Sequence, residues 1–263
     1  MKPETIAYTK EDGIATISFN RPDRLNTLTG PMNREICAAI EEAETDTDVK
    51  VLLLTGTGRA FCAGSDLVEW VPRTPDTHPM QTMWSMRDLG NVYVRLKRFT
   101  KIAIAAINGF AISEGFTIAM LCDIRLASER AKLGEMALKW GTIPDIGSLC
   151  ILPHFVGLSR AMQYIFSGEL IDAKEAARLG IVSEVVPHDE LDARARSLAG
   201  AIARGPRMAL QLTKGLIHRQ LRIDFDSAVQ DYITIQQLCE SSADFHEGLR
   251  AFLEKRQPSF QGK

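Results

Sequence analysis

Short apolar runs, glycine-containing turns and stretches with helical spacing follow one another along the chain. Residues 102–107 form an apolar run bounded by Lys101 and Asn108, and residues 49–55 form a second, mainly apolar run. Short bounded runs of this kind are typical of buried strands, although a buried helix segment has the same lack of periodicity. The turn that follows 102–107 leads into the uncharged apolar stretch 116–122, which predicts a buried helix.

Other regular elements follow from the same patterns. Residues 5–9 and 13–19 are predicted to form a β-hairpin, with Glu11-Asp12-Gly13 as its turn. Pro31 lies in the first turn of a predicted helix, on which apolar residues recur at positions 32, 36, 39, 40 and 43. A short strand is predicted for residues 124–127. Further helices are predicted within residues 88–99, 146–156, 158–166, 173–179, 190–204, 206–219, 224–241 and 244–255.

Strands that alternate with helices, followed by helices alone, indicate an α/β protein with a helical C-terminal region. The chain has 263 residues, of which 45% are hydrophobic and 24% are charged, so it can bury a large core. We expect one catalytic domain over residues 1–190 and a helical appendage over residues 191–263.

Charge and composition narrow the possible partners. The formal net charge of −2 gives no indication of a nucleic-acid or anionic-membrane partner. The 5 cysteines and 5 histidines lack the spacing of metal ligands, so no metal site is expected. The N-terminus lacks an apolar signal segment and no apolar run reaches transmembrane length. A cytoplasmic protein without a membrane partner is therefore expected.

The turn after residues 102–107 has a possible chemical role. A strand, a turn of small residues and a buried helix leave free backbone N–H groups at the helix start, where the helix dipole favours negative charge. Such a place can hold a developing oxyanion, but an ordinary strand-to-helix turn has the same pattern. A similar turn follows residues 49–55, where Ser65-Asp66 could cap a short helix. The two turns could each contribute one N–H group to a shared oxyanion hole.

Two segments resemble those of a known family. Phe61-Cys-Ala-Gly-Ser-Asp-Leu67 and the stretch from Asn108 to Asp123 resemble, in this order and spacing, the signature segments of the crotonase (enoyl-CoA hydratase/isomerase) superfamily. The resemblance implies a crotonase-type α/β fold, with a repeated ββα spiral core over residues 1–190 and a helical trimerisation region over residues 191–263. It also implies an acyl-CoA substrate, no cofactor apart from the CoA of that substrate, and a homotrimer or dimer of trimers.

The resemblance also assigns roles to individual residues. The backbone N–H groups of Ser65 and Glu114 would polarise the thioester carbonyl and stabilise an enolate. The family usually has a small residue where Glu114 stands, and the sequence does not place its carboxylate. In the family the loop 20–26 touches the CoA nucleotide, so Arg24 would meet its phosphates unless it is a solvated surface arginine. The other residues assigned to substrate or CoA binding are Ala63, Asp66, Leu67, Thr117, Trp140 and, in a possible flap over residues 70–87, Trp84.

One carboxylate is the candidate for proton transfer. Hydratases of the family use two glutamates, and the matching positions here hold Thr117 and Ala137. Glu135, if it lies on a strand, is roughly 6–7 Å from Ala137 along the chain, too far to replace the second glutamate. Asp145 stands in the turn 143–147, where the ring-1,2-epoxyphenylacetyl-CoA isomerase branch of the family keeps a single catalytic aspartate. It could also serve as a helix N-cap.

Three functions therefore stay open. The leading hypothesis is an enoyl-CoA isomerase in which Asp145 moves a proton between two carbons, with a pKa that an apolar pocket would raise. The alternative enzyme is an enoyl-CoA hydratase in which Glu114 or Asp145 activates water. A non-catalytic acyl-CoA binder would hold the same ligand without turnover.

Overall fold

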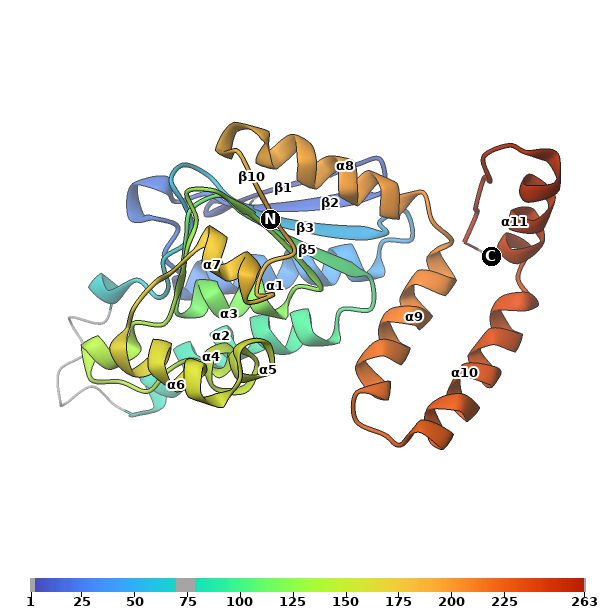
Figure 1. Cartoon of the computed structure of the whole chain (residues 1–263). Helices are drawn as coiled ribbons and strands as arrows, with labels where there is room; N and C mark the ends of the chain where they lie inside the picture. Colours follow the sequence, from blue (N-terminus) through green and yellow to red (C-terminus); the bar gives the residue numbers. More distant parts are fainter. Residues whose placement is uncertain (1–2, 70–78, 263) are drawn as a thin grey trace.

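The computed structural model describes residues 3–69 and 79–262, except for the side chains of residues 69 and 79–85 (Figure 1). At its N-terminal end, β1 (Ile6–Glu11) and β2 (Ile14–Phe19) form the predicted antiparallel hairpin. The turn consists of Asp12 and Gly13, whose φ angles of 50° and 78° an Asp-Gly pair adopts readily.

The strands of the described residues form two sheets. Beyond the hairpin the strands are β3 (Val51–Gly56), β4 (Ala60–Cys62), β5 (Ile102–Ile107), β6 (Phe110–Ile112), β7 (Ile124–Ser128), β8 (Lys132–Gly134), β9 (Ile171–Asp172) and β10 (Glu184–Val186). The larger sheet has the order β1-β2-β3-β5-β7-β10, and the smaller sheet has the order β4-β6-β8-β9. All strand pairs are parallel except β1 with β2 and β8 with β9.

A repeated pair of strands explains how the two sheets are connected. In the pairs β3/β4, β5/β6 and β7/β8, the first strand joins the larger sheet and the second joins the smaller one. This is the repeated spiral of a crotonase-type fold, so the predicted fold class is confirmed. The predicted strands within 49–55, 102–107 and 124–127 are also confirmed. Periodicity did not reveal β4, β6, β8 and β9, because strands of two or three residues are too short to show it.

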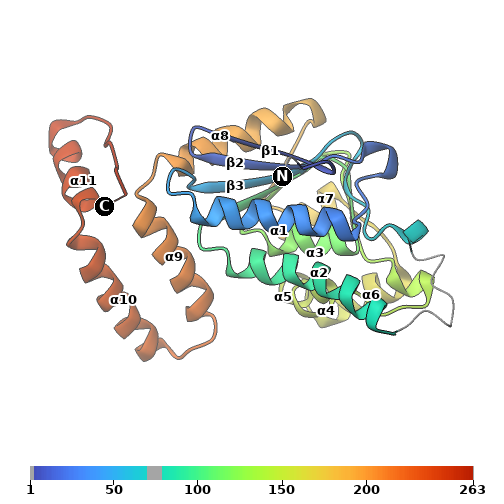
Figure 2. The same cartoon turned by 180° about the vertical axis from the view of Figure 1, so that it is seen from behind.

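Helices cover both faces of the larger sheet (Figure 2). Helix α8 (Leu191–Ala203) lies on one side, and on the other side lie α1 (Gly30–Thr45), α2 (Pro79–Arg98), α3 (Glu114–Leu121), α4 (Ile146–Cys150), α5 (Leu152–Val156), α6 (Leu158–Ser167) and α7 (Ala173–Arg178). The five apolar positions predicted to form the inner face of α1 are all buried, and the Thr29 side chain caps its N-terminus. The helix predicted for residues 146–156 is divided into α4 and α5, where Pro153 in the first turn of α5 suits a helix start.

Helix α8 belongs to the core, although the predicted domain boundary precedes it. Its buried residues, Leu191, Ala195, Ala199 and Ala203, share a hydrophobic cluster with Val51, Leu53, Ile104 and Leu126 of the larger sheet. The projecting part of the chain therefore starts after α8. It consists of α9 (Arg207–Gln220), α10 (Phe225–Glu240) and α11 (Ala243–Glu254), which extend to one side of the sheets (Figures 1 and 2).

An ion pair between the buried Lys214 and the half-buried Asp123 helps to attach this projecting arm to the core. Lys214 of α9 lies 2.7 Å from the Asp123 carboxylate and donates a 2.8 Å hydrogen bond to the carbonyl oxygen of Lys101. Asp123 also accepts a 2.8 Å hydrogen bond from the N–H of Ala103 in β5.

None of the described helices is both long and apolar enough to cross a bilayer.

We predict that Gly115→Ala destabilises the fold. A Cβ at position 115 would lie 2.1 Å from the carbonyl oxygen of Cys62, so α3 could not keep its distance from β4. We expect a loss of about 3 kcal/mol in unfolding free energy, measured by denaturant titration. The control is Gly90→Ala in α2, where a Cβ meets no atom within 4 Å. That change should stabilise the protein by about 0.5–1 kcal/mol. Equal stability of both variants would contradict the close approach.

Candidate active site

Three chain segments meet at one edge of the smaller sheet. Strands β4, β6 and β8 are parallel neighbours, so the residues that follow them leave the sheet on the same side. These residues are the 63–66 segment after β4, Ser113-Glu114 after β6 and Glu135 after β8. In open α/β sheets, ligands bind at the carboxyl ends of parallel strands. The edge therefore brings together both predicted N–H donors, Ser65 and Glu114.

Ser65 is oriented by pairing between two loops. Residues 63–66 run beside residues 25–28 and exchange three backbone hydrogen bonds of 2.8–3.1 Å with them. This leaves the N–H of Ser65 directed to α3, where it donates a 2.9 Å hydrogen bond to Oε2 of Glu114. The Ser65 hydroxyl donates a second, 2.5 Å hydrogen bond to Oε1 of the same carboxylate. The sequence did not place the Glu114 side chain. In the structure its carboxylate accepts a hydrogen bond from the Ser65 N–H, which is one of the two predicted oxyanion donors.

Helix α3 begins from an unusual backbone conformation at Ser113. Its φ of 48° and ψ of −111° are rare for a residue with a side chain. Ser113 keeps this conformation through a 2.9 Å hydrogen bond from its N–H to Gly134 and a 2.7 Å hydrogen bond from its hydroxyl to Glu135. Its carbonyl accepts the first helical bond, from Thr117, so the N–H of Glu114 has no acceptor within the helix. Backbone strain of this kind is concentrated at functional sites.

The buried side chain of Glu135 links these segments through hydrogen bonds, and we call this group of contacts the Glu135 clasp. Glu135 is 2% exposed, and its carboxylate accepts hydrogen bonds of 2.7–3.0 Å from the hydroxyls of Ser113 and Ser148 and from the N–H groups of Met136, Ala137 and Asp145. A buried carboxylate with this many donors is fully satisfied and fixed in place. Glu135 therefore holds the site together and has no oxygen directed at a substrate.

Asp145 is the N-cap of α4, as predicted. Its Oδ1 accepts a 3.0 Å hydrogen bond from the N–H of Ile146. Its Oδ2 accepts a hydrogen bond from the hydroxyl of Tyr93, which lies on α2. Helix α4 packs closely on α3 at this point. The absence of a side chain at Gly147 allows this, since a Cβ there would lie 2.4 Å from the Thr117 hydroxyl oxygen. Two hydrogen bonds and the adjacent helix thus orient the Asp145 carboxylate.

The surroundings of Asp145 shift its ionisation towards neutral pH. Burial raises the pKa of Asp145 to about 6, and the charge of Glu114 acts in the same direction. Hydrogen bonds from Tyr93, Ile146 and Thr117 oppose this shift by stabilising the carboxylate. Burial and the charge of Asp145 raise the pKa of Tyr93 well above its usual range, so Tyr93 stays a hydrogen-bond donor. Asp145 can therefore both accept and release a proton near neutral pH.

Comparison with known proteins identifies the family. The sequence profile described as enoyl-CoA hydratase/isomerase matches residues 9–263. The chain belongs to the enoyl-CoA hydratase/isomerase family. It is 35% identical over 253 residues to the 1,2-epoxyphenylacetyl-CoA isomerase of Escherichia coli K12. The match covers 96% of this chain and 97% of that protein.

Hydratases of the family are similar to the same degree. The short-chain-enoyl-CoA hydratase of Clostridium acetobutylicum is 36% identical over 260 residues, with 97% of both chains covered. The crystal structure of enoyl-CoA hydratase from Bacillus anthracis superposes with a TM-score of 0.93 at 30% identity, with 99% of this chain and 100% of that chain covered. The protein is thus an acyl-CoA enzyme of this family, with both isomerases and hydratases among its relatives.

Two residues assigned to substrate binding have structural contacts instead of exposed surface. Thr117 is fully buried, and its hydroxyl oxygen accepts a 3.2 Å hydrogen bond from the N–H of Gly147. Asp66 is 6% exposed and forms a 2.8 Å ion pair with Arg21. Although burial opposes ionisation of Asp66, Arg21 holds its pKa below the usual range. Both residues support the site from the interior.

The other assigned residues differ in exposure. Arg24 is exposed at the end of a short 3-10 helix, Pro22–Arg24, and Ala63 is half-buried. Leu67 and Trp140 are 40% and 62% exposed. The side chain of Trp84 and residues 70–78 of the expected flap lie outside the described residues, whereas residues 79–87 of that flap form the start of α2. Contact of these residues with CoA or an acyl group stays a prediction.

Sequence reasoning missed Tyr93, although the chain contains a signal for it. Tyr93 adjoins Val92 on α2, a helix that buries Leu89, Val92 and Leu96. A tyrosine on an inward-facing part of a helix usually needs a hydrogen-bond partner for its hydroxyl. The partner, Asp145, comes from a turn 52 residues further along the chain.

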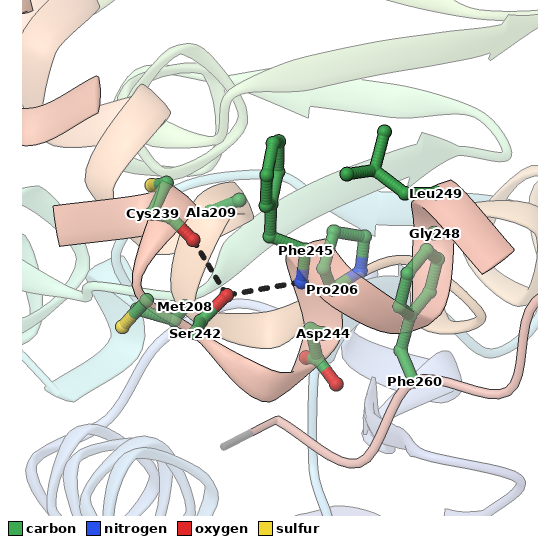
Figure 3. A pocket seen from close by; sticks show the side chains of 10 residues that line it. All are labelled: Pro206, Met208, Ala209, Cys239, Ser242, Asp244, Phe245, Gly248, Leu249 and Phe260. Atoms are coloured by element: carbon green, nitrogen blue, oxygen red, sulfur yellow. Dashed lines mark hydrogen bonds between the residues drawn. The ribbon is translucent and has the colours of Figure 1, made fainter. Parts of the chain in front are cut away.

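A cavity of about 270 Å³ lies apart from this site, in the helical arm (Figure 3). The described residues that line it are Pro206, Met208, Ala209, Cys239, Ser242, Asp244, Phe245, Gly248, Leu249 and Phe260. None of these residues belongs to the predicted acyl-CoA site. Within the described ranges, histidine, cysteine and acidic side chains form no group of three or more that could hold a metal ion.

We predict that Tyr93→Phe raises the pKa of Asp145 further above 6. The change removes a hydrogen bond that stabilises the Asp145 carboxylate and keeps the aromatic ring. Titration of ¹³C-labelled aspartate side chains by NMR measures the pKa directly, and Asp145→Asn assigns the resonance. An unchanged pKa in Tyr93→Phe would show that the hydroxyl does not act on the carboxylate.

Proposed function

We propose that this acyl-CoA enzyme moves a carbon–carbon double bond by proton transfer, with Asp145 as the proton carrier. The observation that carries the proposal is the state of this carboxylate. It is half-buried, both of its oxygens are oriented by hydrogen bonds, and its pKa is about 6. A proton carrier works best when its pKa is close to the working pH.

The reaction would proceed through an enolate. The thioester oxygen of a 3-enoyl-CoA would bind at the backbone N–H groups of Ser65 and Glu114. Asp145 would remove a proton from C2, and the electron pair would move onto the thioester oxygen. Asp145 would return the proton to C4, which leaves the double bond between C2 and C3. No atom is gained or lost, so the reaction needs no cofactor.

The side chains of the site favour isomerisation over hydration. The positions of the two hydratase glutamates hold Thr117 and Ala137, whose side chains carry no acid group. The neighbouring Glu135 is fully engaged in holding the site together. Hydration is the second candidate. Glu114 lies close enough for its charge to raise the pKa of Asp145, and two carboxylates near one substrate could position a water molecule. The hydratases among the relatives also favour it.

The exposed apolar side chains near Asp145 support an apolar acyl group. Trp140, Ile143 and Ile146 are 62%, 78% and 46% exposed, and all three lie within five residues of Asp145 along the chain. Apolar side chains beside a few polar groups are typical of small-molecule sites. Arg24, exposed on the loop after β2, would contact the CoA phosphates.

We predict that Asp145→Asn lowers the conversion of 3-enoyl-CoA to 2-enoyl-CoA by about 10²–10⁴-fold, because it removes the proton acceptor. Asparagine is also a good N-cap, so the melting temperature should change little. Conversion is measured by the absorbance of the conjugated thioester. Parallel incubation with 2-enoyl-CoA tests for 3-hydroxyacyl-CoA, the product of a hydratase.

A matched control is Asp172→Asn. Asp172 caps α7 with φ and ψ of −75° and 167°, close to the −74° and 160° of Asp145, but lies on the exposed surface. The control should keep the original rate. If Asp145→Asn also keeps it, the proton carrier is another group. If only 3-hydroxyacyl-CoA forms, the protein is a hydratase, and thioester binding without turnover would indicate a binder.

We further propose that the helical arm assembles the protein into a trimer or a dimer of trimers. Leu221, Phe225 and Phe252 of the arm are 80–81% exposed, which is unusual for large apolar side chains without a partner. Light scattering should give a mass of three or six chains of 29.1 kDa, and Phe252→Asp should lower it. A stable monomer of the unaltered chain at micromolar concentration would contradict assembly.

A further inference from the structure

We propose that the Glu114 carboxylate is the resident ligand of the oxyanion hole, and that a thioester oxygen binds only by displacing it. The proposal rests on the proposed function, since it takes the N–H groups of Ser65 and Glu114 as the hole. It makes Glu114 a specificity-determining residue, because it decides which oxygen atoms can bind at this position.

The contact between Glu114 and Ser65 uses both donors of Ser65. The backbone N–H donates to Oε2 over 2.9 Å, and the hydroxyl donates to Oε1 over 2.5 Å. Hydrogen bonds to an ionised acceptor are stronger than those between neutral groups. A neutral thioester oxygen therefore competes with a better acceptor for the same N–H group.

The backbone on both sides is shaped around this carboxylate. Gly64 has a φ of +97°, and a Cβ there would lie 2.8 Å from Oε2 of Glu114. On the other side, the strained conformation of Ser113 sets the direction in which α3 begins. The N-terminus of α3 also favours negative charge in its first turn. The carboxylate is therefore held by space, hydrogen bonds and the helix dipole together.

Loss of a contact usually weakens binding, but loss of the Glu114 carboxylate should strengthen binding of the thioester. One backbone N–H cannot serve two acceptors equally, so Glu114 must rotate away before the thioester oxygen enters. A glycine at position 114 removes the competing carboxylate and keeps the backbone N–H at this position. The variant should therefore bind the thioester more tightly than the unaltered protein.

The test compares two ligands that differ at the carbonyl oxygen. Butyryl-CoA has the thioester oxygen, whereas S-butyl-CoA, a thioether, lacks it. Isothermal titration calorimetry should show that Glu114→Gly binds butyryl-CoA about ten times more tightly than the unaltered protein does. The affinity for S-butyl-CoA should be the same in both proteins.

Two further variants test the charge of Glu114 and its hydrogen bond to the Ser65 hydroxyl one at a time. Glu114→Gln keeps the size but not the charge, so it should give a smaller gain. Ser65→Ala removes the hydroxyl that holds Oε1 and keeps the backbone N–H, so it should also give a smaller gain. A melting temperature for each variant confirms that it is folded. A loss of butyryl-CoA affinity in Glu114→Gly, or an equal gain for both ligands, would overturn the proposal.

A second measurement does not depend on CoA. The Ser65 amide should exchange its hydrogen slowly in the unliganded protein and faster in Glu114→Gly, as followed by NMR. Equal exchange rates in the two proteins would overturn the proposal. If exchange differs as expected but neither CoA ligand binds any variant, the acyl-CoA function fails, while Glu114 still occupies the Ser65 donor.

Discussion

The buried carboxylate of Glu135 is the interaction on which the candidate site depends. It receives five hydrogen bonds, from the start of α3, from the turn after β8 and from both sides of the α4 start. A buried charge is tolerated only when hydrogen bonds replace its hydration, and here they also connect three chain segments. The strained backbone of Ser113 and the position of Asp145 both follow from this clasp.

The repeated fold explains why these segments meet. Each repeat sends one strand into the larger sheet and a shorter one into the smaller sheet, so β4, β6 and β8 end on the same side. The repeats approach each other closely, and Gly115 leaves no room for a side chain against Cys62. The site is therefore built from backbone positions that the core holds rigidly, which suits an oxyanion hole made of N–H groups.

Two carboxylates with different environments stand in this site. Asp145 is oriented by Tyr93 and the α4 backbone, and its pKa of about 6 is set mainly by burial. Glu114 is held by both donors of Ser65. The negative charge of Glu114 raises the pKa of Asp145, so movement of the Glu114 carboxylate away from Asp145 would lower that pKa.

The sequence by itself determined the elements whose signals are local. Asp12-Gly13 specifies a hairpin turn, the spacing of Met32, Ile36 and Ile40 specifies the buried face of α1, and the apolar run 102–107 specifies a buried strand. Asp145 after Pro144 specifies a helix cap. These features depend on neighbouring residues, so periodicity and turn chemistry could predict them.

Only the tertiary structure decided the contacts that give the site its chemistry. Glu114 meets Ser65 across 49 residues of chain, and Tyr93 meets Asp145 across 52. The short strands β4, β6 and β8 likewise exist because each pairs with its neighbour, not because of their own sequence. Contacts of this kind depend on how distant elements pack together, and no local pattern of residues specifies that packing.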